Sequence, residues 1–231
     1  MTSKKVNIET VKSGMANGIS EQLATKQAID GPTATLDKWE KQHIIENAAE
    51  CFGNFLTALG VDWENDPNSN NTPMRVAKAY VNDLWKGRYE VAPDITAFPA
   101  DGYDGMVFEG GIPLTSMCSH HHQTITGKVH VAYIPGKDAK VVGLSKLNRI
   151  IEHFGRRGAI QEQLTMAIHN AVNTTISDSK GVAVMIEATH NCVKCRGVKH
   201  EGAVMKTSKL TGAFINESEV RAEFYTFVVN L

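Results

Sequence analysis

The sequence predicts an α+β fold in which two N-terminal helices precede antiparallel strands with helices on one side. Apolar residues recur at three- and four-residue steps in 37–60 and 72–87, as in helices with one buried face. Segments 129–134 and 182–187 alternate with a period of two, as strands do. Helical spacing returns between them, at 147–175, so helices and strands alternate within one folded unit.

The composition of the chain is that of a globular protein. Of its 231 residues, 42% are hydrophobic and 21% are charged, which allows a core of its own. A net charge of −1 gives no general attraction to nucleic acid or to an anionic membrane. No run of about 18 apolar residues is present, and no secretory signal follows the N-terminal lysines. Because four cysteines fit a reducing compartment, we expect a cytoplasmic protein without nucleic-acid or membrane partners.

The first 36 residues differ from the rest of the chain. Residues 1–36 lack a sustained apolar stripe and are rich in Thr, Ser, Lys and Gly. We expect a mobile arm there, and a docking or regulatory segment is the alternative. The folded domain would then be 37–231, with a helical part at 37–87 and a strand-containing part at 106–231.

The two leading helices have expected ends. In the first helix, Gly60 follows the last apolar residue as a stop. In the second, Thr72 is the expected N-cap and Pro73 the first helical residue, and the helix runs through Trp85 to a stop at Gly87. Their expected buried faces are Ile45, Ala48, Ala49, Phe52, Phe55, Leu56 and Leu59 in the first helix, and Ala77, Tyr80, Val81 and Leu84 in the second.

Strand patterns follow a loop-rich stretch at 88–105. The strand at 129–134 ends at the turn residues Pro135 and Gly136, and Gly127 is expected to mark a turn or bulge before it. A second strand covers 182–187. A looser extended region is expected at 203–214.

Three helices are predicted in the second half of the chain. Their buried faces have helical spacing: Leu147, Ile150, Ile151 and Phe154; Ile160, Leu164, Ala167, Ile168, Ala171, Val172 and Thr175; and Val220, Phe224, Phe227 and Val228. The last helix, near 217–229, is expected to have Asn216 as its cap and Glu219 three residues on, an Asn variant of the capping box.

Two short segments concentrate metal-binding residue types. Five of the nine histidines and three of the four cysteines lie in or beside 118–122 (CSHHH) and 190–195 (HNCVKC). Both segments adjoin predicted strands, so they can meet side by side in a sheet. Because thiolate and imidazole are preferred ligands of Zn²⁺, the segments predict a zinc site.

The number of protein ligands decides what kind of zinc site this is. A structural site closes four ligands around the metal, whereas a catalytic site uses three and leaves a place for water. Cys192 and Cys195 alone suggest a zinc knuckle, a structural site closed by four protein ligands. Such a site normally takes a second pair of ligands with similar spacing, but Cys118 is accompanied only by adjacent histidines. His120 and His121 are neighbours on an extended chain and point to opposite faces, so one can bind metal while the other faces substrate. A closed knuckle, or inert thiols and histidines, are the alternatives.

Basic residues and one amide–carboxylate pair suggest an anionic, base-containing ligand. Lys146 and Arg149 share a face in the first turn of a helix that also presents Ser145. Cations there oppose the helix dipole, which favours an anion as their partner. Gln161 and Glu162 open the next helix and can read the edge of a base; exposed helix-start residues are the alternative. Further positive charge comes from Arg75, Lys78 and Arg196, although a solvated charged face would also explain it.

Six stretches are together similar to the GTP cyclohydrolase I family. They are 72–78 (TPMRVAK), 115–121 (TSMCSHH), 131–135 (VAYIP), 143–146 (GLSK), 161–165 (QEQLT) and 190–197 (HNCVKCRG), in the order and spacing of that family. The resemblance covers about residues 40–230 and is specific, because several separated motifs agree.

The resemblance implies a fold and a reaction. The fold is the tunnelling fold, in which α+β subunits join their sheets into a barrel, here as a homodecamer of two stacked pentamers with active sites between subunits. The reaction converts GTP and water into formate and 7,8-dihydroneopterin triphosphate, the first step of pterin, folate or 7-deazapurine synthesis. The implied cofactor is one Zn²⁺ per subunit.

The resemblance also implies roles by position. Zinc would be held by Cys118, His121 and Cys192, and the catalytic residues would be His120, His190 and Ser145. The residues that bind the triphosphate and ribose would be Arg75, Lys78, Ser145, Lys146, Arg149 and Arg196, and those that read guanine would be Gln161 and Glu162.

Two positions depart from the pattern of that family. Ser119 stands where the family usually has Glu, and loss of that charge would alter metal affinity or a histidine pKa. Cys195 stands where the family usually has no cysteine, and we expect a bystander there rather than a fourth ligand or a disulfide partner of Cys192. These departures leave two alternatives: a catalytically silent GTP-binding or zinc-stabilised assembly protein, and a related tunnelling-fold enzyme for another purine or pterin.

Overall fold

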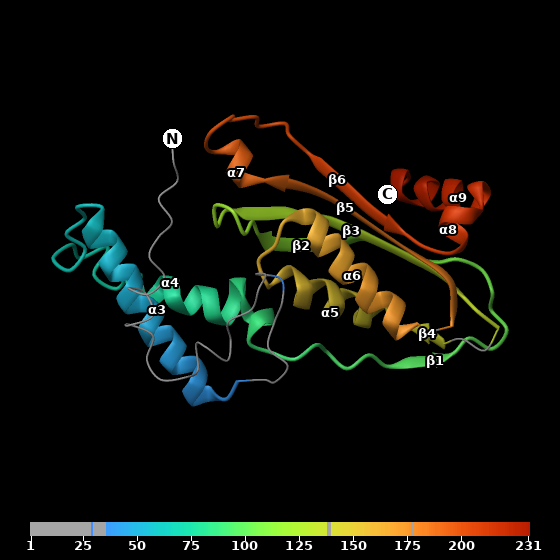
Figure 1. Cartoon of the computed structure of the whole chain (residues 1–231), viewed down its shortest axis with the longest axis horizontal. Coiled ribbons are helices and arrows are strands. Elements are labelled where there is room, and N and C mark those ends of the chain that lie inside the picture. Colours follow the sequence, from blue (N-terminus) through green and yellow to red (C-terminus); the bar gives the residue numbers. More distant parts are fainter. Residues whose placement is uncertain (1–28, 30–35, 138–139, 177) are drawn as a thin grey trace, which may run out of the picture.

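A computed structural model describes residue 29 and residues 36–137, 140–176 and 178–231. The expected N-terminal arm, residues 1–36, lies outside these described residues except for Ile29 and Leu36. Two helices stand at one end of a four-stranded sheet, and further helices cover the sheet (Figure 1). The α+β fold class is therefore confirmed.

The leading helices are α3 (Lys38–Ala58) and α4 (Thr72–Ala79). Asp37 and Glu40 form a capping box at the start of α3, and Gly60 follows its end at φ 79°. The first helix is thus confirmed, but Phe55 and Leu59 of its expected buried face are exposed.

The second helix differs from its prediction at both ends. It begins at Thr72 with Asn71 as N-cap, so Thr72 is not the cap. After Ala79 the chain continues as a π-helix, η1 (Tyr80–Leu84), and as a 3₁₀ turn, η2 (Lys86–Arg88), rather than as one α-helix. π-Helical turns occur often at functional sites, and η1 ends beside the histidine-rich turn described below.

The main sheet has the strand order β2–β3–β5–β6, and all its pairs are antiparallel. The strands are β2 (Val107–Met117), β3 (Thr124–Pro135), β5 (Ser179–His190) and β6 (Met205–Leu210), and a separate pair joins β1 (Ala97–Pro99) to β4 (Lys140–Val142).

The expected turn or bulge at Gly127 is wrong, because β3 runs unbroken through this residue. Gly127 lies opposite Ala188 of β5. A Cβ atom at this position would lie 2.1 Å from the carbonyl oxygen of Glu187. Glycine is therefore required for close approach of the two strands and not for a turn.

Helices cover both faces of the sheet. Helices α5 (Leu144–Gly155) and α6 (Gln161–Thr175) pack on one face and enclose the larger core, as predicted. Helices α8 (Ala213–Asn216) and α9 (Ser218–Val229) pack on the other face, where Phe214 and Phe224 are fully buried. The chain therefore adds a small second layer to the expected helices on one side.

The last helix has a different start from the predicted one. Asn216 ends α8, and Glu217 precedes α9 without a side-chain cap bond, so the predicted Asn capping box is absent. Phe224 is buried as expected, whereas Phe227 is 38% exposed.

Candidate metal centre

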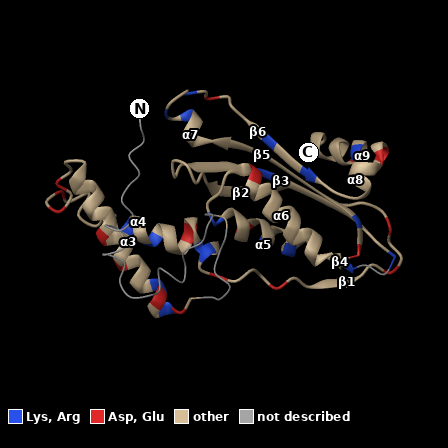
Figure 2. Cartoon of the chain, viewed as in Figure 1, with Lys and Arg blue, Asp and Glu red and all other residues tan. Residues whose placement is uncertain are grey.

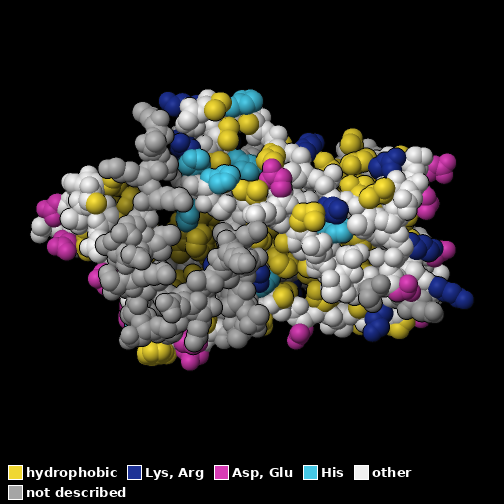
Figure 3. Space-filling model, viewed as in Figure 1, with side chains coloured by type: hydrophobic (Ala, Val, Ile, Leu, Met, Phe, Trp, Pro, Cys, Tyr) yellow, Lys and Arg dark blue, Asp and Glu magenta, His cyan; other side chains and the backbone are white. Residues whose placement is uncertain are grey.

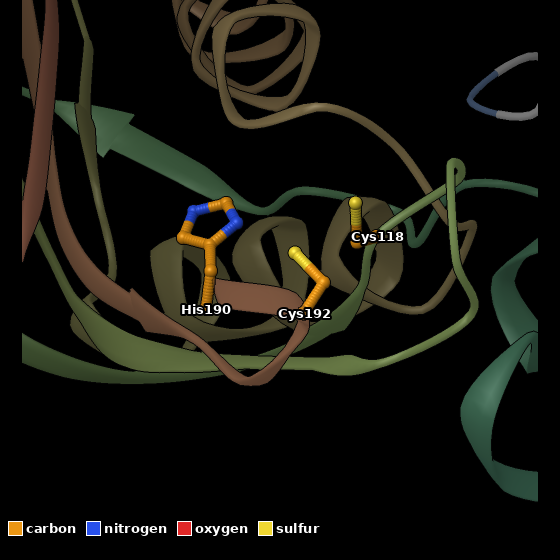
Figure 4. Close-up of side chains that lie close together, drawn as sticks. All are labelled: Cys118, His190 and Cys192. Atoms are coloured by element: carbon orange, nitrogen blue, oxygen red, sulfur yellow. The ribbon is translucent and has the colours of Figure 1, made fainter. Parts of the chain in front are cut away.

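Three potential metal ligands meet at one end of the main sheet. Cys118 follows β2 directly, His190 is the last residue of β5, and Cys192 lies in the short helix α7 (Asn191–Lys194). Strand β3 lies between β2 and β5, so its first residues bring the ends of these two strands together. The ligand atoms of the three residues all lie within 4.8 Å of one another (Figure 4).

The donor set of this group fits zinc. Tetrahedral Zn²⁺ with Zn–S near 2.3 Å and Zn–N near 2.0 Å places ligand atoms about 3.5–3.8 Å apart, so the ligand atoms would move together by roughly 1.3 Å at most. Burial and the neighbouring Cys118 thiol raise the pKa of Cys192. A divalent cation would reverse this effect, because it stabilises the thiolate form.

A tight turn carries the three consecutive histidines. The amide of Cys118 donates to the carbonyl of Gln123 at 2.9 Å, and the amide of His122 donates back to the carbonyl of Cys118 at 2.9 Å. His120, His121 and His122 are all exposed on this turn. Figure 3 shows histidine side chains gathered near this end of the molecule. The structure therefore places His120 and His121 beside Cys118 but does not bring His121 into the group of three.

The turn is supported from two sides. Ala159 forms an isolated bridge with Cys118 and donates its amide to Met117 at 3.0 Å. On the other side, the Tyr80 hydroxyl lies 3.3 Å from Nδ1 of His122, and the Trp85 ring centre lies 5.2 Å from that of His122. The π-helix thus contacts the histidine turn, a contact that the sequence did not indicate.

His190 contacts a buried amide. Its Nε2 atom lies 2.7 Å from Oε1 of Gln161, whose side chain is only 1% exposed. Burial lowers the pKa of His190, and the neighbouring Glu162 carboxylate raises it. Gln161 lies on the same stripe as Leu164 and Ile168 of α6, and a polar residue on such a buried stripe is the sequence signal that could have identified this contact.

The predicted anion-binding residues do not all lie at this end. Exposed Arg196 follows α7, but Ser145 and Lys146 lie in the first turn of α5, which begins at the other end of the sheet (Figures 1 and 2). Arg149 lies one turn further along α5 and lines a pocket with Lys86, Gly87 and Glu152. Ile125 of β3 pairs with His190, and Tyr133 lies eight positions further along the same strand, where its hydroxyl accepts from the amide of Val142 just before α5. This spacing corresponds to about 26 Å of strand.

Arg75 and Lys78 lie on α4 and are both exposed. The side chain of Lys146 reaches the carbonyl of Asp94 at 3.3 Å. The structure therefore brings together Cys118, His190, Cys192, Gln161 and Glu162, and leaves the α5 cations apart from them.

Comparison with known proteins decides the family. The family model for GTP cyclohydrolase I matches residues 48–229. The chain belongs to the GTP cyclohydrolase I family. It is 41% identical over 191 residues to GTP cyclohydrolase 1 of Aeromonas hydrophila, covering 82% of this chain and 84% of that protein. It is 39% identical over 217 residues to GTP cyclohydrolase 1 of Actinobacillus pleuropneumoniae, covering 93% and 97%.

A solved structure gives a looser likeness. The archaeosine synthase QueF-Like in the apo form matches with a TM-score of 0.38 and 16% identity, over 46% of this chain and 93% of that chain, which is too little to support an argument. The GTP cyclohydrolase I relationship therefore rests on sequence, and it makes this chain a member of an enzyme family with an α+β tunnelling fold.

Cys195 is one of the two positions, with Ser119, at which the chain departs from the expected GTP cyclohydrolase I pattern. Its sulfur donates to the carbonyl of Asn191 at 2.7 Å and lies outside the metal-ligand group. Among the described helices, none combines the length and the hydropathy needed to cross a membrane.

Proposed function

We propose that this chain catalyses the GTP cyclohydrolase I reaction, in which GTP and water give formate and 7,8-dihydroneopterin triphosphate. The observation that carries the proposal is the group of two thiols and one imidazole within 4.8 Å, in a chain of this family. The first step is hydrolytic opening of the guanine ring at C8, which needs a nucleophile, a proton at N7 and positioning of the triphosphate.

The proposed metal is one Zn²⁺ per chain, held by Cys118, His121 and Cys192. Two thiols and an imidazole suit zinc, and His121 lies on the turn that begins at Cys118. His190 is the competing imidazole ligand, because its ligand atom lies within 4.8 Å of both cysteine sulfurs. When bound, zinc would supply the nucleophile, because it lowers the pKa of water from 15.7 to about 7.

Two histidines would transfer protons. Guanine C8 is a poor electrophile until N7 is protonated, and His190 lies next to the proposed metal where it can exchange that proton. An imidazole with an unperturbed pKa near 6.5 can give and retake a proton near neutral pH. His120, on the exposed turn, is assigned to ribose opening and rearrangement, with Ser145 as a further catalytic residue.

The triphosphate would be bound by Arg75, Lys78, Ser145, Lys146, Arg149 and Arg196, and guanine by Glu162; the resemblance also assigns Gln161 to guanine. Several cations suit a tetra-anionic ligand, because a charge pair at 4 Å contributes about 1 kcal/mol in water and about 4 kcal/mol at an effective dielectric constant of 20. Of the proposed guanine contacts, Glu162 has an exposed side chain, whereas the Gln161 amide is already hydrogen-bonded within the chain.

A single chain would hold only part of this site. One GTP molecule cannot span the 26 Å estimated between His190 and the first turn of α5, so the α5 cations of one chain would serve a neighbour's metal centre. Strands β2 and β6 are the two edges of the main sheet, where copies can join by strand pairing. We therefore propose a homo-oligomer, a decamer of two stacked pentamers whose sheets form barrels.

The four free cysteines are typical of a reducing compartment, and we propose the cytoplasm as its location. No partner other than GTP and further copies of the chain is proposed.

The test is to incubate zinc-loaded protein with GTP and to measure formate and pterin fluorescence together. Both products are expected, and a chelator should abolish both. The Cys118→Ala variant should lose zinc and turnover, whereas His120→Ala should retain zinc and lose turnover. Bound GTP without formate would refute the proposal and favour the catalytically silent alternative, which Ser119 and Cys195 suggest.

A further inference from the structure

The orientation of the Gln161 side-chain amide is fixed by two backbone carbonyls. Its Nε2 atom lies 3.2 Å from the carbonyl oxygen of Ile186 and 3.0 Å from that of Met205. A carbonyl oxygen only accepts, so the nitrogen and not the oxygen of the amide must face these two groups. Thr207 adds a third acceptor at 3.1 Å.

The oxygen of the same amide determines which ring nitrogen of His190 carries the hydrogen. Oε1 of Gln161 lies 2.7 Å from Nε2 of His190, and an amide oxygen can only accept. Nε2 must therefore carry a hydrogen, and in the neutral ring Nδ1 carries the lone pair. Figure 4 shows one ring nitrogen of His190 on the side of the Cys118 and Cys192 sulfurs.

We propose that Gln161 is a positioning residue that holds His190 with its hydrogen on Nε2, so that Nδ1 is the nitrogen offered to the site. The proton that His190 exchanges with substrate is then the one on Nδ1, and Nε2 takes no part in the transfer. The role of Nδ1 in proton transfer rests on the proposed function, whereas the orientation of the His190 ring does not.

Gln161 is well placed for this role because its own position is fixed. Its side chain is 1% exposed and its amide contacts both β5 and β6. Thr165, one turn further along α6, lies 2.7 Å from the Thr207 hydroxyl and donates to the Gln161 carbonyl, but no hydrogen bond joins it to His190. Thr165 therefore provides a control for packing of α6 against β6.

The experiment uses full-length, zinc-free protein labelled with ¹⁵N-histidine, sedimented for solid-state NMR at pH 8. The His190 ring signal is assigned by its loss in His190→Asn. We expect Nε2 to be protonated in the wild type, and the hydrogen-bonded Nε2–H signal to be lost in Gln161→Met and retained in Thr165→Val. Zn²⁺ titration against a chromophoric chelator should give the same affinity in Gln161→Met and in the wild type, because His190 is not among the proposed ligands. A 10- to 100-fold weaker affinity, about the effect of removing an outer-shell partner of a ligand, would make His190 a metal ligand and overturn its role in proton transfer.

A wild-type ring protonated on Nδ1 would overturn the proposal at once. An Nε2–H signal that is unchanged in Gln161→Met would also overturn it, as would equal loss of the signal in Thr165→Val. A protein that shows the expected NMR pattern but releases no formate from GTP would refute the proposed function and support the positioning role of Gln161.

Discussion

Sharing of the active site between chains can be tested by combining two inactive variants. Cys118→Ala removes a proposed metal ligand at one end of the sheet, and Lys146→Ala removes a cation in the first turn of α5, beyond about 26 Å of β3. Each variant alone should be inactive. If a site takes its metal centre from one chain and its α5 cations from another, the two defects need not fall in the same site.

The expected recovery follows from the independence of the two halves. In an assembly of both variants at equal amounts, each half is intact with a probability of about one half, so about one quarter of the sites should be complete in a symmetric oligomer. The variants would be co-expressed with different tags, purified through both tags and assayed for formate per chain. A site contained within one chain would recover nothing, because every chain carries a defect.

A matched control separates complementation from a general effect of mixing. Cys118→Ala combined with Cys192→Ala places both defects in the metal centre, which one chain supplies, so no recovery is expected. Recovery in this control, or none in the Cys118→Ala and Lys146→Ala assembly, would refute the shared site.

Three further predictions concern stability and metal content. Burial and the Arg157 charge lower the pKa of His153 to about 4 in the folded protein. As the pH falls from 6.5 to 4, the unfolded chain therefore binds a proton at this histidine before the folded chain does, and the free energy of unfolding decreases. Urea unfolding should show that the free energy of unfolding of the wild type decreases by about 3 kcal/mol over this pH range and that this decrease is absent in His153→Gln. An equal pH dependence in the wild type and the variant would contradict this. Gly158→Ala should lower the free energy of unfolding by about 1–2 kcal/mol or more, because φ at this residue is +75° and a Cβ atom would lie 2.8 Å from Nε1 of Trp85. An unchanged urea midpoint of the variant would contradict this. Cys195→Ser should keep one zinc per chain by elemental analysis, and zinc loss would make Cys195 a ligand.

Local patterns predicted the elements that depend on local interactions. Helices α3, α5 and α6 follow from apolar stripes, and the strands β3 and β5 follow from alternation, although both strands are longer than their predicted cores. The failures need distant partners. Gly127 is explained by the approach of β5, and the short strand β1 exists only by pairing with β4, which lies about forty residues later.

The candidate site also has parts that the sequence predicted and parts that depend on contacts between distant elements. Residue chemistry alone predicted a zinc site in segments 118–122 and 190–195, because thiolate and imidazole are preferred zinc ligands, and the family resemblance then selected Cys118 and Cys192 among them. The contact between His190 and Gln161 depends on how α6 lies across β5 and β6, which no spacing in the sequence reports. The family position of His121 as a ligand stays a prediction, because its ring lies outside the observed group.

X-ray absorption at the zinc edge of the loaded protein is the most direct test of the metal centre on which the proposed reaction depends. The proposed ligand set predicts two sulfur neighbours near 2.3 Å and nitrogen or oxygen neighbours near 2.0–2.1 Å, with at least one position filled by water. A spectrum with three sulfur neighbours, or full activity without any bound metal, would contradict it.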